Sequence, residues 1–316
     1  MGERLSVRQL GRRPAIREFP CELPRPLDWR VLAGRVMGNL QVVLGLSILG
    51  LMVLTALLAP LIAPHDAPRR QELANRLQPP FLMEGGSWRY PLGTDDLGRD
   101  ILSRMVHGVR ISLLVGGLAV LLSGAIGVSL GLLSGYFGGW VDDLLMRVCD
   151  VQLAIPLTLL AIAVIAVVGS SLPTLIGVLG LTQWVMYARI VRGEALSIRE
   201  KEFVEASRAI GATDLRIIRT CILPNALPTI LVTATLRMAT VIMIEAGLSY
   251  LGLGIQPPNP SLGSMLSDGR QYLATAWWLG TFPGLAIMLI VLGINLLGDG
   301  LRDLLDPRSR RRIHGG

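Results

Sequence analysis

The chain has 316 residues, of which 51% are hydrophobic and only 17% are charged, and its net charge is +7. This balance is typical of a bundle of membrane helices rather than of a soluble globule. The basic residues are scattered over the flanks of apolar segments and no recognition motif accompanies them, so the positive charge does not predict nucleic-acid binding.

The amino-terminal segment precedes the first apolar run. Residues 1–26 are rich in Arg and Pro and predict a disordered cytoplasmic tail. Leu27, Val31, Leu32 and Val36 share one helical stripe, which predicts an interfacial helix on the inner leaflet, with a disordered flank as the alternative. The apolar run that follows is longer than the core of a signal peptide, so we expect this segment to stay attached.

Apolar runs recur along the chain, and each reaches the roughly 20 residues that cross a hydrocarbon core about 30 Å thick. The runs are Leu40–Pro64, Ile111–Val141, Val151–Ala188, Pro224–Ile244 and Leu279–Leu297. The third run is long enough for two helices, because the helix-stopping residues of segment 169–173 divide it. The sequence therefore predicts an all-α integral membrane protein with about six transmembrane helices.

The positions of the basic residues predict the orientation of these spans. With both termini in the cytoplasm, the inner segments hold 21 Lys and Arg residues and the outer segments hold eight, as the positive-inside rule requires. The predicted parts are a disordered tail (1–26), an interfacial helix with the first span (27–64), an extracytoplasmic loop (65–110), a core of five transmembrane helices (111–301) with a cytoplasmic loop (189–223), and a basic cytoplasmic tail (302–316).

The second span contains three glycines at intervals of four residues, Gly127, Gly131 and Gly135. This spacing lets a neighbouring helix approach closely in lipid, so we interpret these glycines as packing residues. The same stretch matches the G-x-S-x-G nucleophile elbow at Ser129, which raises an intramembrane serine hydrolase as an alternative. All three histidines of the chain lie outside the spans, so this alternative lacks a general base, and a metal centre has no support.

The cytoplasmic loop is a polar segment between apolar spans. Residues Glu202–Ile210 are good helix formers, Gly211 suits the left-handed conformation that ends helices, and Thr213 or Asp214 can cap the next turn. The small residues Ala206, Ser207 and Ala209 leave a flat face for a partner surface, although an ordinary amphipathic loop helix is the alternative.

One absence restricts the function of the chain. A phosphate-binding P-loop needs a lysine directly after its last glycine, and the sole lysine here is Lys201, between two glutamates. The chain is therefore not predicted to be a Walker ATPase. Active transport would need a separate ATPase subunit or an ion gradient, and a gradient-driven secondary transporter is left open, although we find no convincing internal repeat.

Two ionisable residues lie in or beside the fifth span. Arg237 is 13 residues past Pro224, near the middle of the span, where a charge is unfavourable unless it faces water or a counter-ion. Glu245 is eight residues further and shares its helical face. We predict that this pair lines a translocation path. The alternative is a structural bridge or, for Glu245, a place at the outer boundary.

The polar loop also carries a family resemblance. The residues that match are Glu205, Ala206, Ser207, Gly211, Cys221, Leu223 and Pro224. They resemble the EAA loop of permease subunits in binding-protein-dependent ABC importers, with departures at Ser207 and Cys221, where alanine and isoleucine are usual. Further matching stretches are Tyr90–Asp100, Leu248–Gly254 with Pro257-Pro258, and Gly298–Asp303. Over residues 27–310 the chain is similar to the C-type permease of dipeptide, oligopeptide and nickel importers.

This resemblance implies a type I ABC importer permease fold in the bacterial inner membrane. It implies a B-type permease, two cytoplasmic ABC ATPases and an extracytoplasmic binding protein as partners. The chain itself would be non-catalytic and hold no cofactor or metal, because ATP and Mg²⁺ would bind to the ATPases. The implied ATPase-docking residues are Glu205, Ala206, Ser207, Gly211, Leu223 and Pro224. Peptides are the implied cargo, with nickel, glutathione and other small solutes as alternatives.

Overall fold

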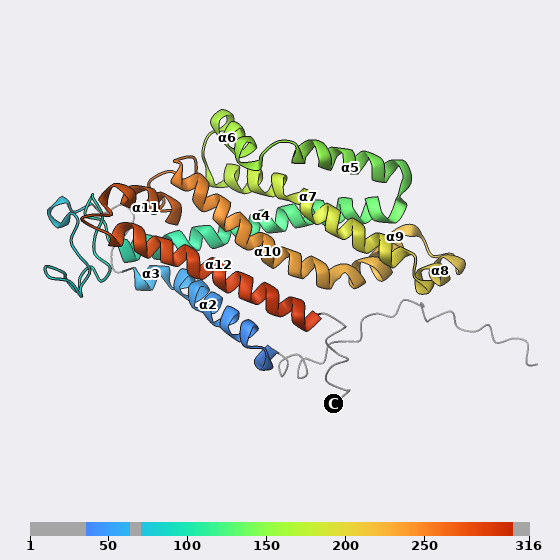
Figure 1. Ribbon diagram of the computed structural model, residues 1–316, viewed down its shortest axis with the longest axis horizontal. Coiled ribbons are helices and arrows are strands. Elements are labelled where there is room, and N and C mark those ends of the chain that lie inside the picture. The colour runs from blue at the N-terminus through green and yellow to red at the C-terminus, as the bar shows by residue number, and fades with distance from the viewer. Residues whose placement is uncertain (1–35, 64–70, 306–316) are drawn as a thin grey trace, which may run out of the picture.

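Helices form nearly all the regular structure of the protein in its computed structural model, which describes residues 36–63 and 71–305 (Figure 1). Thr94 and Asp100 add an isolated β-bridge. The α-helices are α2 (Leu40–Leu57), α3 (Ala59–Ile62), α4 (Ile101–Phe137), α5 (Gly139–Leu153), α6 (Leu157–Val168), α7 (Leu172–Arg199), α8 (Glu202–Ala209), α9 (Asp214–Ile217), α10 (Leu223–Tyr250), α11 (Leu262–Gly269) and α12 (Trp278–Leu305). Short 3₁₀ turns lie at Leu73–Asn75 and Arg270–Tyr272, and a π-turn at Ile218–Ile222 joins α9 to α10.

Five helices in the described residues are long and apolar enough to cross a membrane: α2, α4, α7, α12 and the joined segment Asp214–Tyr250. A sixth span results if α5 and α6, which meet at an angle of 80°, are taken together. The predicted all-α architecture with about six spans is thus confirmed. The predicted break at 169–173 is also present, because α6 ends at Val168 and α7 begins at Leu172.

The closest packing in the bundle joins α4 to α7, along the predicted glycine positions. A Cβ atom built on Gly127 would lie 2.3 Å from the Trp184 carbonyl oxygen, and one on Gly131 would lie 2.6 Å from that of Ala188. A Cβ atom on Gly135 would lie 2.6 Å from the Cβ atom of Ala195. These distances leave no room for a side chain, so the prediction that the glycines permit close helix packing is confirmed.

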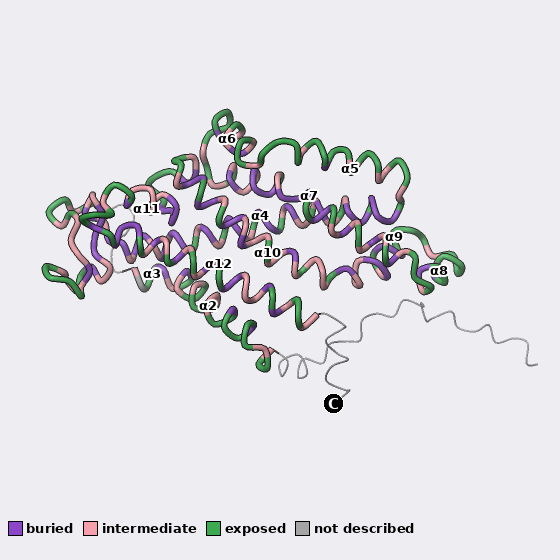
Figure 2. The backbone as a smooth tube through the Cα atoms, viewed as in Figure 1, coloured by how far each residue is buried: buried purple, intermediate pink, exposed green. Residues whose placement is uncertain are grey.

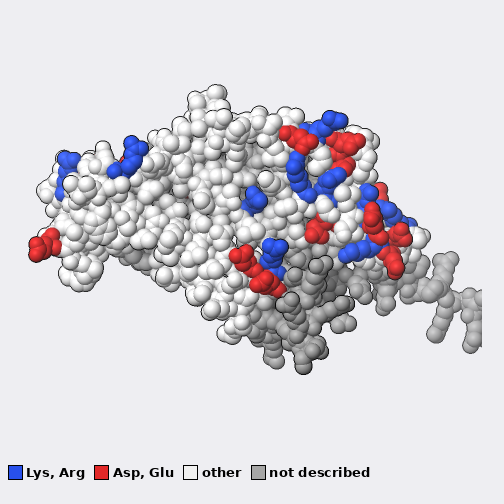
Figure 3. All heavy atoms as spheres, in the orientation of Figure 1, with Lys and Arg blue, Asp and Glu red and all other residues white. Residues whose placement is uncertain are grey.

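The remaining spans pack around this pair, and the buried residues lie mainly on α4, α7, α10 and α12 (Figure 2). Helix α12 packs on α2 at another close approach, where a Cβ atom on Gly45 would lie 2.6 Å from the Leu297 nitrogen. On the face shown in Figure 3, charged side chains are most numerous at the end that carries α8 and α9 and a few lie at the opposite end. The stretch between them carries few charges apart from a group beside the grey residues at the lower edge. The ends therefore face water and the middle faces lipid or protein.

Several boundaries differ from the predicted ones. Helix α4 begins at Ile101, so the outer loop that was predicted to reach residue 110 ends at Asp100, whose side chain accepts a hydrogen bond from the Ser103 nitrogen at 3.0 Å and caps the helix. Helix α4 ends at Phe137 because Gly138, with φ of +64°, reverses the chain before α5. Helix α12 continues to Leu305, past the predicted boundary at 301. The tail 1–26, residues 27–35 of the interfacial helix and residues 306–316 lie outside the described residues.

Candidate functional site

The predicted docking loop is a short helix, a tight turn and a second short helix at one end of the bundle (Figure 1). Helix α8 ends in a Schellman motif, in which the Ala212 nitrogen donates to the Ser207 carbonyl at 3.1 Å and the Gly211 nitrogen donates to the Arg208 carbonyl at 2.9 Å. Gly211 has φ of +81°, the left-handed conformation that was predicted for it. Thr213 occupies the N-cap of α9, but no side-chain cap bond forms there.

One face of α8 packs against the rest of the subunit. Val204 and Ser207 are fully buried, and Val204 joins the core cluster that contains Ile217 and Ile222. The Ser207 hydroxyl donates to the Phe203 carbonyl at 2.8 Å and lies 3.7 Å from the Cys221 sulfur. Ser207 therefore faces the subunit, contrary to the flat partner-facing surface that we expected it to share with Ala206, because it lies almost one turn after Val204 on the inward side.

The opposite face of α8 and the turn are open to solvent. Glu205, Ala206 and Gly211 are exposed, and the apolar side chains of Ile210 and Leu215 are exposed by 52% and 57%. Leu223 and Pro224, the other two predicted docking residues, are only partly buried at the start of α10, and Leu223 packs against the core cluster below the loop. The exposed surface thus combines a carboxylate, a small residue and two large apolar side chains, which is a composition suited to a protein partner.

Contacts that the sequence did not reveal hold this loop on the end of α4. The Tyr136 hydroxyl donates to Asp214 Oδ1 at 2.6 Å, and the Arg208 guanidinium lies 5.2 Å from the centre of the Tyr136 ring. Arg199 Nη1 donates to the carbonyls of Gly135 and Tyr136 at 3.1 and 3.2 Å. The loop is therefore fixed to the tightly packed α4–α7 pair, so a force on the loop acts on the bundle.

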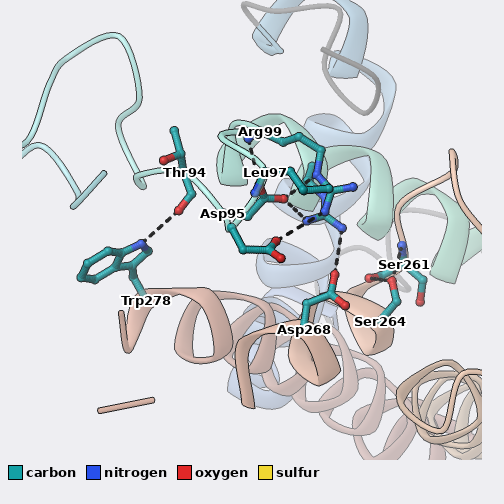
Figure 4. A network of polar contacts seen from close by, with 10 residues as sticks. Thr94, Asp95, Leu97, Arg99, Ser261, Ser264, Asp268 and Trp278 are labelled. Carbon is teal, nitrogen blue, oxygen red and sulfur yellow. Dashed lines mark hydrogen bonds and ion pairs between the residues drawn. The ribbon is translucent and has the colours of Figure 1, made fainter. Parts of the chain in front are cut away.

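The opposite end of the bundle holds a network of charged residues, drawn in Figure 4. Asp95 is its centre: its carboxylate accepts hydrogen bonds from the Leu97 and Arg99 nitrogens at 2.9 and 2.8 Å, from Arg99 Nε at 2.6 Å, and from Arg104 Nη1. The second arm of the Arg104 guanidinium reaches Asp268 of α11 at 3.4 Å. The stretch Tyr90–Asp100 thus joins the start of α4 to α11 through a buried arginine.

This network borders a polar cavity of about 360 Å³, whose lining includes Arg99, Arg104, Ser249, Gln256 and Asp268. Burial raises the pKa of the Asp268 carboxyl above its usual value, and the positive charge of Arg104 opposes this shift. Trp278, at the start of α12, is buried, and its Nε1 donates to the Thr94 carbonyl at 3.4 Å (Figure 4). Its neighbour Trp277 is 42% exposed.

Replacing Arg104 with methionine is expected to destabilise this end of the bundle by about 3 kcal/mol, because Asp95 would keep a buried charge with one partner fewer. Thermal unfolding in detergent measures this loss. Arg110→Met, at an exposed position of the same helix, is the control. The Arg104 substitution should cost less stability in the Asp268→Asn protein than in the wild type, because the Arg104–Asp268 contact is already weakened there. Equal costs in the two proteins would contradict the pairing of these residues.

The two residues predicted to line a path occupy different environments. Glu245 is fully buried, and its carboxylate accepts hydrogen bonds from Ser112 at 2.9 Å, Ser249 at 2.8 Å and Ser261 at 3.2 Å. It joins α4, α10 and α11 and faces no open surface of the subunit, which favours the structural alternative for this residue. Arg237 is only partly buried, and its role in a path stays a prediction.

The sequence of this chain matches two known families of membrane transport proteins. Residues 127–311 match the family described as binding-protein-dependent transport system inner membrane component, and residues 29–80 match the N-terminal transmembrane domain of oligopeptide transport permease C. The chain belongs to the C-type binding-protein-dependent transport permeases. It is therefore a multi-pass inner membrane protein of the ABC importer class.

Curated relatives of this permease cover most of its length. It is 44% identical over 266 residues to the di/tripeptide transport system permease protein DppC of Pseudomonas aeruginosa, covering 84% of this chain and 88% of the relative. It is 46% identical over 260 residues to the glutathione transport system permease protein GsiD of Escherichia coli, covering 82% and 84%. A chain of the inward-facing MetNI methionine ABC transporter has the same fold, with a TM-score of 0.53 at 24% identity, covering 64% of this chain and 96% of that chain.

The type I importer permease fold is thereby confirmed, and the loop Glu202–Leu223 lies inside the segment that matches the family. The G-x-S-x-G match in this permease lies within helix α4 and follows no strand. The Ser129 hydroxyl donates to the Ala125 carbonyl at 2.7 Å, as an ordinary helical serine does. The elbow geometry that a serine hydrolase needs is therefore not present at Ser129.

Proposed function

We propose that this permease is the non-catalytic membrane subunit of an ATP-driven importer of di- or oligopeptides. A B-type permease would complete the translocation path, two cytoplasmic ABC ATPases would supply ATP and Mg²⁺, and an extracytoplasmic binding protein would deliver the cargo. The relatives named for di/tripeptides and for glutathione, itself a small peptide, support this substrate class over nickel or other small solutes.

The observation that carries the coupling role is the two-sided helix α8. Its inner face is buried against the bundle through Val204, while Glu205, Ala206 and Gly211 lie on the exposed side. We assign the ATPase contact to this exposed surface, and Ser207, Leu223 and Pro224 support it from beneath. A partner that moves α8 would move α4 and α10 with it, as a rigid-body transition requires.

The assignment of α8 to the ATPase contact also implies an orientation of the subunit in the membrane and a position for the translocation path. With α8 in the cytoplasm, both termini are cytoplasmic, and the network of Asp95, Arg104 and Asp268 faces the binding protein. This agrees with the excess of basic residues in the inner segments. Arg237, in the middle of α10, is assigned to the translocation path.

Ala206→Arg is expected to abolish co-purification of the ATPases and to reduce peptide uptake at least tenfold, because a long charged side chain would separate two closely fitting surfaces. Ala74→Arg, the same substitution at an exposed site of the outer loop, should leave both unchanged. Full retention of the ATPases by Ala206→Arg would contradict the docking site. Uptake that persists after ATP depletion but stops when ion gradients are collapsed would favour a secondary transporter.

A further inference from the structure

The middle of α10 holds a charge that the described part of the subunit does not neutralise. Arg237 lies within the membrane-spanning segment Asp214–Tyr250 and forms no ion pair with a described residue. Its Nε atom is buried and has no hydrogen-bond partner in the described ranges. A guanidinium at this depth is unfavourable unless it meets water or an anion, so a group outside these residues must compensate it.

A second unpaired polar group lies on the facing helix. Tyr187 of α7 is 1% exposed, and its hydroxyl also has no hydrogen-bond partner among the described residues. The hydrogen bond between Thr229 of α10 and Glu194 of α7 sets these helices in a register that brings this hydroxyl to the level of Arg237. Two adjacent orphan groups in a buried region are unusual, because buried polar atoms are nearly always hydrogen-bonded.

The register of the two helices explains this proximity. Helices α7 and α10 run antiparallel (Figure 1), and the Thr229 hydroxyl donates to Glu194 Oε1 at 2.9 Å. Tyr187 is seven residues before Glu194 on α7, and Arg237 is eight residues after Thr229 on α10. Both offsets equal about two helical turns, so Tyr187 and Arg237 repeat the facing arrangement of the bonded pair.

The surroundings of this pair are apolar. Tyr187 belongs to the buried cluster that contains Val241, against which Ala234 and Met238 pack. Ala234 and Val241 lie three residues before and four residues after Arg237, on its own face of α10. The ring of Tyr187 lies over Gly124 of α4, where an added Cβ atom would be 4.0 Å from the hydroxyl. In such surroundings an arginine fork is well suited to a carboxylate, which it can bind through two parallel hydrogen bonds.

We propose that Arg237 binds the free carboxylate of the peptide cargo during translocation and that Tyr187 positions the guanidinium. Arg237 is partly exposed, although its Nε atom is buried, so its terminal nitrogens are the atoms we assign to the path. In the proposed arrangement Arg237 Nε donates to the Tyr187 hydroxyl oxygen, and both terminal nitrogens of the guanidinium bind the cargo carboxylate. This proposal rests on the proposed function as a peptide importer, and it makes Arg237 a specificity-determining residue.

The test uses the complete importer in proteoliposomes, with the partner permease, the ATPases and the binding protein. Uptake of trialanine is compared with uptake of trialanine amide, each at saturating loaded binding protein. In Arg237→Gln the ratio of acid to amide uptake should fall about tenfold, because charge-assisted hydrogen bonds to the carboxylate are lost. Tyr187→Phe should lower the ratio about threefold, and adding it to Arg237→Gln should have no further effect. Arg110→Gln, which removes an exposed charge, is the matched control and should keep the wild-type ratio.

An unchanged ratio in Arg237→Gln, or an equal loss for both peptides, would overturn the proposal; an equal loss would indicate an acidic partner in the second permease. If the importer does not assemble with Arg237→Gln, the Tyr187→Phe variant provides the test. An unchanged ratio of acid to amide uptake in that variant then overturns the proposal. Failure of the proposed function would differ from both results, because the wild-type importer would then take up neither peptide.

Discussion

Replacing Gly131 with leucine is expected to prevent most of the permease from reaching its folded state. A Cβ atom at this position would lie 2.6 Å from the Ala188 carbonyl oxygen and 3.0 Å from the Val191 Cβ atom. Because one of these contacts is with backbone, α4 and α7 must move apart, and overpacking of this kind costs about 3 kcal/mol. The two helices carry the loop that we assign to the ATPase, so loss of their packing also removes the docking surface.

Gly117→Leu is the matched control for this prediction. Gly117 lies on the same helix, and a Cβ atom there meets nothing within 4 Å. The yield of monodisperse protein after detergent extraction and its thermal unfolding temperature measure the effect. We expect Gly117→Leu to resemble the wild type, and equal losses in the two variants would show that leucine in α4, rather than the contact with α7, causes the defect.

Gly211→Val is expected to leave the subunit in the membrane but to abolish transport-coupled ATP hydrolysis. Gly211 has φ of +81°, where a β-branched residue is strained by at least about 1–2 kcal/mol, although a side chain there would have free space around it. The Schellman bonds of Ala212 and Gly211 depend on this conformation, so valine should open the last turn of α8. The exposed docking surface would then lose its shape while the buried bundle stays intact.

Gly211→Asn separates conformation from size, because asparagine adopts the left-handed conformation far more readily than valine. Binding-protein-stimulated ATP hydrolysis and peptide uptake should be largely retained in this variant. Membrane content is measured for both variants by immunoblotting. Undiminished uptake by Gly211→Val would exclude the coupling role, and equal loss in the two variants would show that the added side chain, rather than the left-handed conformation, causes the defect.

Patterns within single helices predicted much of the fold. The apolar runs predicted the spans, and the four-residue spacing of Gly127, Gly131 and Gly135 predicted a closely packed helix pair. Gly211 was recognised from its place after a short run of helix formers. These features are local, because helix periodicity and the conformational freedom of glycine act over a few residues.

Features that depend on distant residues were missed. Ser207 was placed on the docking face because it is small, but burial depends on the packing of α8 against Ile217 and Ile222. The buried position of Trp278 likewise involves a distant partner, the Thr94 carbonyl, 184 residues away. The contact between Arg104 and Asp268 spans 164 residues. No single-sequence pattern indicates such pairs, because side-chain partners are set by how the helices assemble.

Helix α10 connects the features on which this permease depends. Its 28 residues extend about 42 Å, from the end of the α8–α9 loop at Leu223 to Tyr250 near the polar cavity. Arg237 lies halfway along it, and the buried carboxylate of Glu245 joins the part near Tyr250 to α4 and α11. The helix thus connects the α8–α9 loop to a fixed point at the opposite end of the bundle. A tilt imposed at the loop end of α10 would displace its middle, and with it Arg237, in the same movement. The movement of a partner docked on the loop would therefore reach the middle of the bundle without a series of side-chain rearrangements.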